Sequence, residues 1–145
     1  MPVGERPAAL RYVETSALLA ALLEGDASVA ASLLADGPKV TSSLTMVEAH
    51  RAVRRAATSG RLSAGDADRV HAQIEVIRRR VDVMRLTDDV VARAGQAFPV
   101  EPIRALDALH LASALALDEY PGHVTIVTRD DGLIANARAL GFGLE

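Results

Sequence analysis

The segment LRYVETSALLAALLEGD (residues 10–26) joins an apolar, β-prone run directly to a helix-like run of Ala and Leu. Glu14 stands at the junction between the two runs. A buried strand that passes straight into a buried helix is typical of parallel sheets, whose faces are covered by helices. We therefore predict a strand at residues 10–13 and a helix at residues 16–23, with a carboxylate between them that needs a chemical explanation.

The same alternation of short apolar runs and helical runs continues to the end of the chain. Further strands are predicted at residues 39–42, 81–86, 123–128 and 142–145. Further helices are predicted at residues 26–35, 44–58, 63–80, 87–98, 104–117 and 131–140, with Asp26 and Thr87 as caps. This order predicts an N-terminal tail (residues 1–9) and one α/β domain (residues 10–145). We expect a three-layer α/β/α sandwich with a central parallel sheet.

Composition limits the class of protein. A chain of 145 residues favours one domain, and 50% hydrophobic residues suffice for a core built from Ala, Leu, Val and Ile. The absence of Cys excludes disulfides and thiolate metal sites, which fits a reducing compartment. No apolar run approaches the ~20 residues of a membrane span, and the N-terminal sequence MPVGERPAA lacks the apolar core of a signal peptide. We expect a cytoplasmic protein with no membrane partner.

The charge balance argues against nucleic-acid binding by bulk charge. The net charge is −3 and the pI is about 5.8. A nuclease is still compatible with this balance, because the acidic residues of a metal site lower the pI. The cationic residues are fifteen Arg and one Lys, and Arg suits bidentate contacts to phosphate. A high Ala and Arg content also fits plain genomic base composition.

Four carboxylates are expected at one edge of the sheet. Glu14 follows the first strand, and Asp130 follows the strand at residues 123–128. Glu48 and Asp107 lie early in their helices. Because functional sites form beyond the carboxyl ends of parallel strands, the four acids converge if these helices begin at that edge.

Each acid also has a purely structural explanation. Asp130 or Asp131 can cap the last helix, and Thr45 with Glu48 fits a capping box. An acid in a first helical turn also offsets the positive end of the helix dipole. These alternatives remain open from the sequence.

Asp107 lies in a helix that is otherwise almost wholly apolar. Over residues 105–117 the polar residues are Asp107, His110 and Ser113, which share one arc of about 120°. A nearly buried carboxylate needs a partner or a metal ion. Arg104, one turn earlier, is the alternative partner, and His110 is either a metal ligand or a hydrogen-bonded interior residue.

Converging carboxylates repel one another and raise each other's pKa, which a hard divalent cation relieves. Such an ion also lowers the pKa of a bound water and neutralises charge on a phosphodiester. The residues therefore predict metal-assisted hydrolysis of a phosphate ester. A phosphoacceptor domain would need a Lys near the end of the last long strand, but the one Lys is Lys39. A haloacid-dehalogenase-type phosphatase would need Asp-x-Asp after the first strand, which is absent.

The segments YVETSALLAALL, SSLTMVEAHRAV, LDALHLASAL and IVTRDDGLIANARALG together resemble the PIN domain. The resemblance is to the VapC toxin ribonucleases of type II toxin–antitoxin systems, and it runs from about residue 10 to the end. The motifs of that family are a strand followed by Asp-Thr-Ser-Ala, then T-x-x-E, then D-A-x-H, then T-x-D. Carried onto this chain, they imply these catalytic residues and metal ligands: Glu14, Glu48, Asp107 and Asp130, with Asp131 as a less suitable substitute for the last.

The resemblance also implies an activity and partners. It implies an endoribonuclease that depends on Mg²⁺ or Mn²⁺, forms a homodimer, and is inhibited by a cognate antitoxin that inserts into the active site. Thr15 and Thr128 would help to hold the acidic cluster or its waters. The arginines of the helix after Glu48 would meet RNA phosphate or the antitoxin, or form a solvated face: Arg51, Arg54 and Arg55.

Glu14 departs from the family pattern, which has Asp at this position. The extra methylene moves the carboxylate by about 1.5 Å, and a misplacement of ~1 Å can cost about a hundredfold in rate. The alternative interpretation is therefore a PIN-like module with weakened catalysis that binds RNA or an antitoxin.

Overall fold

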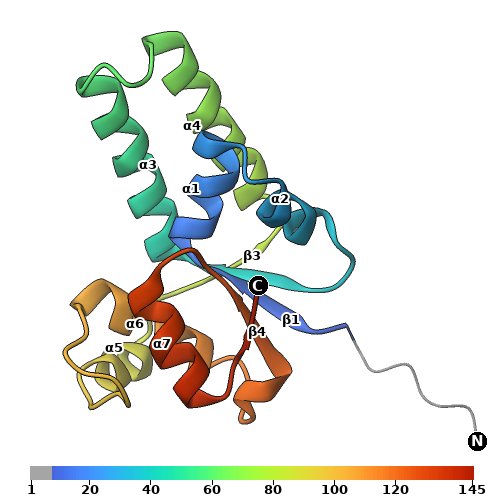
Figure 1. Cartoon of the computed structure of the whole chain (residues 1–145), viewed down its shortest axis with the longest axis vertical. Helices are drawn as coiled ribbons and strands as arrows, with labels where there is room; N and C mark the ends of the chain where they lie inside the picture. The colour runs from blue at the N-terminus through green and yellow to red at the C-terminus, as the bar shows by residue number, and fades with distance from the viewer. Residues whose placement is uncertain (1–7) are drawn as a thin grey trace, which may run out of the picture.

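The computed structural model describes residues 8–145 (Figure 1). Residues 1–7 of the predicted tail lie outside the described residues. The division into a tail of residues 1–9 and a domain from residue 10 onward therefore stays a prediction.

A five-stranded parallel sheet forms the middle layer of the molecule. Its strands are β1 (Leu10–Val13), β2 (Lys39–Ser42), β3 (Asp82–Met84), β4 (Val124–Val127) and β5 (Gly143–Leu144). They lie in the order β3-β2-β1-β4-β5, and every neighbouring pair is parallel. The order reverses at β1, which pairs with β2 on one side and β4 on the other. A crevice opens beyond the strand ends at such a switch point.

Helices cover both faces of the sheet, as Figure 1 shows. The helices on one face are α1 (Thr15–Glu24), α2 (Ala27–Leu34), α3 (Ser43–Thr58) and α4 (Ala64–Arg78). Those on the other face are α5 (Asp88–Ala94), α6 (Ala105–Leu115) and α7 (Asp131–Leu140), and a short 3₁₀ turn at Pro121–His123 precedes β4. The predicted three-layer α/β/α sandwich is confirmed.

Each face of the sheet has its own apolar core. Successive residues of a strand point to opposite faces, so Val13 and Tyr12 of β1 enter different cores. The core that contains Val13 is formed with α1, α3 and α4 by Leu18, Met46, Ala49, Val53, Ala67, Val70 and Ile74. The core that contains Tyr12 includes Phe98, Ala108, Leu111, Ala114, Val124, Ile126, Leu133, Ala137 and Phe142. Burial on both faces explains why the strands read as continuous apolar runs.

Local signals mark most of the helix ends. Asp26 and Thr87, both predicted as caps, accept backbone N–H bonds at the starts of α2 and α5. Gly25 and Gly141 follow α1 and α7 with φ of 66° and 90°, a conformation that glycine adopts without strain. The helix predicted at residues 87–98 is wrong at its end, because α5 stops at Ala94. A residue before proline disfavours helical dihedrals, and the backbone N–H of Phe98, which precedes Pro99, donates to Glu101 Oε1 at 2.9 Å.

Within residues 8–145, no single helix combines the length and the apolar composition needed to cross a bilayer. The pair α1 and α2 reaches those limits only when taken together, across a bend of 115°.

Candidate active site

The four predicted acids line one pocket of about 330 Å³ at the switch point. They are Glu14, Glu48, Asp107 and Asp130, which come from the junction of β1 with α1, from α3, from α6 and from the start of α7. Asp131, the substitute for the fourth acid, is exposed in the first turn of α7 and lies outside this pocket as the described residues define it. The structure thus brings Glu14, Glu48, Asp107 and Asp130 to one pocket, and their assignment as catalytic residues and metal ligands stays a prediction.

Glu14 is the most buried of these acids, with 4% of its surface exposed. Its Oε2 accepts hydrogen bonds from the backbone N–H of Ser16 at 3.0 Å, from the Ser16 hydroxyl, and from Thr128 Oγ1 at 2.8 Å. The side chain thereby caps α1 and ties the end of β1 to the end of β4. Its other oxygen, Oε1, lies 3.9 Å from Nε2 of His110. One carboxylate oxygen is therefore an anchor, and the other faces the remaining polar side chains of the site.

Glu48 is oriented by a chain of buried side chains. Its Oε1 accepts a hydrogen bond from Thr15 Oγ1 at 2.7 Å and lies 2.6 Å from His110 Nε2. The other ring nitrogen of His110, Nδ1, lies 2.8 Å from the hydroxyl of Tyr12. Because an ionised carboxylate only accepts hydrogen bonds, a neutral His110 donates from Nε2 to Glu48 and accepts from Tyr12 at Nδ1. His110 thus links the sheet to α3.

Burial and hydrogen bonding have opposite effects on the pKa values of the side chains in this hydrogen-bonded series. Burial raises the pKa of Tyr12, so its hydroxyl keeps its proton and can donate. Burial alone would also raise the pKa of Glu48, but the hydrogen bonds from His110 and Thr15 outweigh it and hold the pKa below its ordinary value. Glu48 is therefore ionised at neutral pH.

Arg104 bridges the other two acids. Its Nε lies 3.1 Å from Asp107 Oδ2, and one terminal nitrogen lies 3.3 Å from Asp130 Oδ2. The hydrogen bond to Asp107 and the charges of both carboxylates raise the pKa of Arg104. The alternative partner predicted for Asp107 is thus present, and the sequence did not predict its second contact. Asp130 also caps α7, since its Oδ1 accepts from the backbone N–H groups of Gly132 and Leu133 at 2.9 and 3.1 Å.

The capping box of Thr45 and Glu48, which the sequence left open as an alternative, does not form. Ser42 caps α3, with its hydroxyl accepting from the backbone N–H of Leu44 at 3.1 Å. The Thr45 hydroxyl is buried and has no hydrogen-bond partner among residues 8–145. Glu48 instead points across the site, because Thr15 offers it a hydrogen bond there.

Two polar residues of the site were missed from the sequence. Ser16 holds Glu14, and Tyr12 holds His110. A usable signal existed for Tyr12, because a tyrosine in a buried strand needs a partner for its hydroxyl. The apolar helix at residues 105–117 offers two neutral polar side chains, His110 and Ser113. The structure gives His110 the hydrogen-bonded interior position that the sequence left open.

The donor chemistry of the pocket fits a hard divalent cation. Carboxylate oxygens are the ligands that Mg²⁺ prefers in proteins, and four carboxylate side chains line this pocket. Within the described residues, no three His, Asp or Glu side chains already surround a common point. Arg104 accounts for this in part, because its guanidinium supplies positive charge between Asp107 and Asp130. Its side chain is 79% exposed.

Comparisons with known proteins agree with this geometry. The sequence pattern of the PIN domain matches residues 11–139. Ribonuclease VapC35 of Mycobacterium tuberculosis is 31% identical over 137 residues, which cover 92% of this chain and 93% of the relative.

Solved structures share the fold at lower identity. The VapBC2 complex of Rickettsia felis, bound to a DNA fragment from its promoter, matches with a TM-score of 0.67 at 15% identity and covers 94% of this chain and 97% of that one. VapC20 of Mycobacterium tuberculosis, a toxin that cleaves the sarcin–ricin loop, matches with a TM-score of 0.63 at 19% identity, over 86% and 93%. The PIN match includes every residue of the acidic pocket, and this chain therefore belongs to the PIN-domain family, within its VapC group.

Proposed function

We propose that this chain is the toxin of a toxin–antitoxin pair and an endoribonuclease that hydrolyses RNA phosphodiester bonds with Mg²⁺ or Mn²⁺. The observation that carries the proposal is the meeting of Glu14, Glu48, Asp107 and Asp130 in one pocket. They come from four separate parts of the chain. Acids that only capped separate helices would have no reason to meet in one pocket. The identity to a VapC ribonuclease supports RNA as the substrate class.

PIN-domain ribonucleases generally depend on divalent metal ions, and the four acids are the residues that would hold one here. An ion bound there supplies a water of lowered pKa and neutralises charge on the phosphodiester. Glu14 contributes a carboxylate fixed by Ser16 and Thr128. Glu48 contributes one fixed by Thr15 and His110, so neither has to be ordered when substrate binds.

Arg104 has a separate role in this proposal. Its side chain lines the pocket and is largely exposed. Its planar guanidinium can donate two hydrogen bonds at once to the oxygens of a phosphate. In the free protein it neutralises Asp107 and Asp130. When RNA enters, the same group is placed to bind a non-bridging oxygen of the scissile phosphate or its neighbour.

The partners follow from the same proposal. Solved structures with this fold include toxin–antitoxin complexes from Rickettsia felis and Klebsiella pneumoniae, which supports a cognate antitoxin as the protein partner. A homodimer and a cytoplasmic location, as the VapC group implies, complete the proposal.

The test is cleavage of a total cellular RNA pool by the purified, antitoxin-free protein. We expect discrete fragments with Mg²⁺ or Mn²⁺ and intact RNA with chelator. The Glu14→Asp variant belongs in the same experiment, because it restores the carboxylate of the family pattern. Cleavage by that variant alone would mean that Glu14 attenuates the site. Intact RNA from both proteins with both ions would contradict the proposal.

Replacing Arg104 should strengthen metal binding. Arg104→Gln removes the positive charge between Asp107 and Asp130, so the two carboxylates repel and gain more from a cation. Arg104 forms two ion pairs here, and exposed ion pairs are weak, so the dissociation constant for the ion should tighten by up to about fivefold. The rise of Tm with Mn²⁺ concentration measures it, since a ligand of the folded state stabilises that state.

The matched control for this measurement is Arg138→Gln, which removes the same charge from an exposed residue in the last turn of α7. We expect its Mn²⁺ response to equal that of the unchanged protein. An identical response in Arg104→Gln would show that Arg104 and the ion do not compete for the acids.

A further inference from the structure

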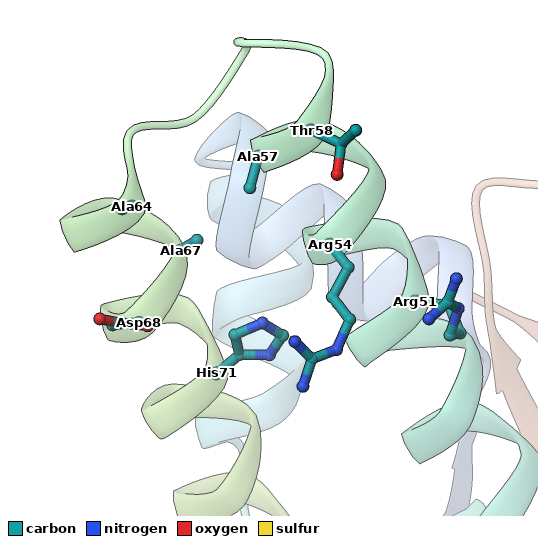
Figure 2. Close-up of a pocket in the computed structure, with 8 residues that line it drawn as sticks. All are labelled: Arg51, Arg54, Ala57, Thr58, Ala64, Ala67, Asp68 and His71. Atoms are coloured by element: carbon teal, nitrogen blue, oxygen red, sulfur yellow. The ribbon is translucent and has the colours of Figure 1, made fainter.

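A second pocket, of about 400 Å³, lies between α3 and α4, outside the acidic site (Figure 2). Its polar lining consists of Arg51, Arg54 and Thr58 from α3 with Asp68 and His71 from α4. Both arginines are exposed, and within residues 8–145 neither forms a salt bridge. The lining therefore carries two unneutralised guanidinium groups against one carboxylate.

His71 is fixed in this pocket by its neighbours. Its Nδ1 lies 2.7 Å from Nδ1 of His50, and the two rings stack with centroids 4.9 Å apart. His50 in turn places its Nε2 3.1 Å from Glu75 Oε1, whose second oxygen accepts from Arg78 at 2.8 Å. These contacts use Nδ1 of His71 and leave its Nε2 without a hydrogen-bond partner among the described residues.

The arrangement does not suit a metal ion but does suit an anion. His50 turns one nitrogen to His71 and the other to Glu75, so the three side chains do not surround one point, and the described residues contain no such group. In Figure 2 the Arg54 guanidinium lies beside the His71 ring within the pocket. Burial, then the charges of His50 and Arg54, lower the pKa of His71. The positive charge at neutral pH is therefore that of the arginines.

The position of α3 relates this pocket to the acidic site. Glu48 and Arg55 of α3 line the acidic pocket, whereas Arg51 and Arg54 line the second one. At 1.5 Å per residue, Arg54 lies about 9 Å from Glu48 along the helix axis. An RNA strand that leaves the acidic pocket across α3 would thus meet Arg55 and then reach the cleft between α3 and α4.

We propose that this cleft is a binding subsite for a backbone phosphate of the RNA strand, a short distance from the phosphodiester that is cut. The inference rests on the proposed ribonuclease function. Arg54 and Arg51 bind the phosphate oxygens through the planar, bidentate contacts that guanidinium groups make. The subsite contacts backbone only, so it contributes affinity and register rather than base choice.

The experiment is fluorescence anisotropy of a short fluorescein-labelled single-stranded RNA, titrated with antitoxin-free protein in chelator over a series of salt concentrations. Each phosphate contact to a single strand contributes about 0.7 to the slope of log K against log salt. We expect Arg54→Gln to weaken binding and make the slope shallower by up to about 0.7. Arg51→Gln/Arg54→Gln should weaken binding further but bring the total loss of slope to no more than about 0.7, because the two arginines contact one phosphate. Arg79→Gln is the matched control, because it removes one exposed charge from the end of α4 outside this pocket.

A kinetic arm separates the subsite from the site of cleavage. With Mn²⁺ present, Arg54→Gln should raise KM several-fold and leave kcat unchanged, because the four acids are intact. An unaltered affinity, slope and KM in Arg54→Gln, with normal binding by the unchanged protein, would overturn the subsite and leave the ribonuclease proposal standing.

Two further outcomes also overturn the inference. An unchanged protein that neither binds nor cleaves RNA would end the proposed function, and the subsite with it. Equal competition by polyglutamate for the labelled RNA would mean that the cleft recognises an acidic polypeptide rather than a phosphate backbone.

Discussion

Asp107→Asn should lower the rate of RNA cleavage by between about 10²- and 10³-fold, the usual effect of removing one group that stabilises developing charge. Asp107 lies on α6, with 14% of its side chain exposed. Asparagine has the same shape and keeps an oxygen that can accept from Arg104, so the expected loss comes from charge and not from packing. The measurement is the initial rate of fragment formation with Mn²⁺, alongside the Tm of both proteins in chelator.

Asp131→Asn is the matched control for that substitution. Asp131 is exposed and lies outside the pocket of the four acids. The cleavage rate of Asp131→Asn should therefore stay within about twofold of that of the unchanged protein, as for most surface substitutions. Equal losses in the two variants would mean that general electrostatics, and not the pocket, govern cleavage. An undiminished rate in Asp107→Asn would remove Asp107 from the catalytic set.

His110→Leu should destabilise the protein by about 3 kcal/mol, or roughly 10 °C in Tm. His110 is 1% exposed and is the hydrogen-bond partner of both Tyr12 and Glu48. Its removal leaves a buried hydroxyl and a half-buried carboxylate with fewer partners, and each such group costs about 1–3 kcal/mol. Urea unfolding in chelator measures the free energy of unfolding without a contribution from metal binding.

A double-mutant cycle shows whether this cost comes from the hydrogen bond to Tyr12. Tyr12→Phe alone removes the hydroxyl, and in the His110→Leu background the same change removes a group that is already unpaired. The double variant should therefore cost less than the sum of the single variants by at least about 0.5 kcal/mol. Two outcomes would contradict the role assigned to the hydrogen bonds that link Tyr12, His110 and Glu48. One is a double variant whose loss of unfolding free energy equals the sum of the two single losses. The other is a loss below about 1 kcal/mol for His110→Leu.

The fold was predictable because each strand is short, apolar and followed by a helical run. The strands at residues 10–13 and 39–42 and the helix at residues 131–140 have the predicted bounds. The convergence of the acids was predictable for a related reason, since parallel strands bring their carboxyl ends to one edge. Neither prediction depends on which side chains are in contact.

The errors arise where a local signal competes with a distant partner. Thr45 and Glu48 have capping-box spacing, but Glu48 finds Thr15, 33 residues earlier, and His110, 62 residues later. Arg104 was predictable as a partner for Asp107 one turn away, whereas its contact with Asp130 spans 26 residues. Sequence spacing reports neighbours within one element, and these contacts exist only once α3, α6 and α7 are packed on the sheet.

Glu14 illustrates the same limit. The sequence shows a glutamate where the family has aspartate, but not how the longer side chain is accommodated. In the structure one oxygen is held by Ser16 and Thr128, and the other lies toward His110. The extra length is thus taken up by an anchor between the ends of β1 and β4, which keeps the carboxylate at the pocket.

The most direct test of the metal-dependent acidic site is a time course of RNA cleavage by chelator-treated, antitoxin-free protein. Mn²⁺ is added at the start and excess chelator partway through, with Asp107→Asn run in parallel. We expect cleavage to begin on addition of Mn²⁺, to stop on addition of chelator, and to be nearly absent in Asp107→Asn. Cleavage that proceeds at the same rate before Mn²⁺, after chelator and in Asp107→Asn would contradict the account.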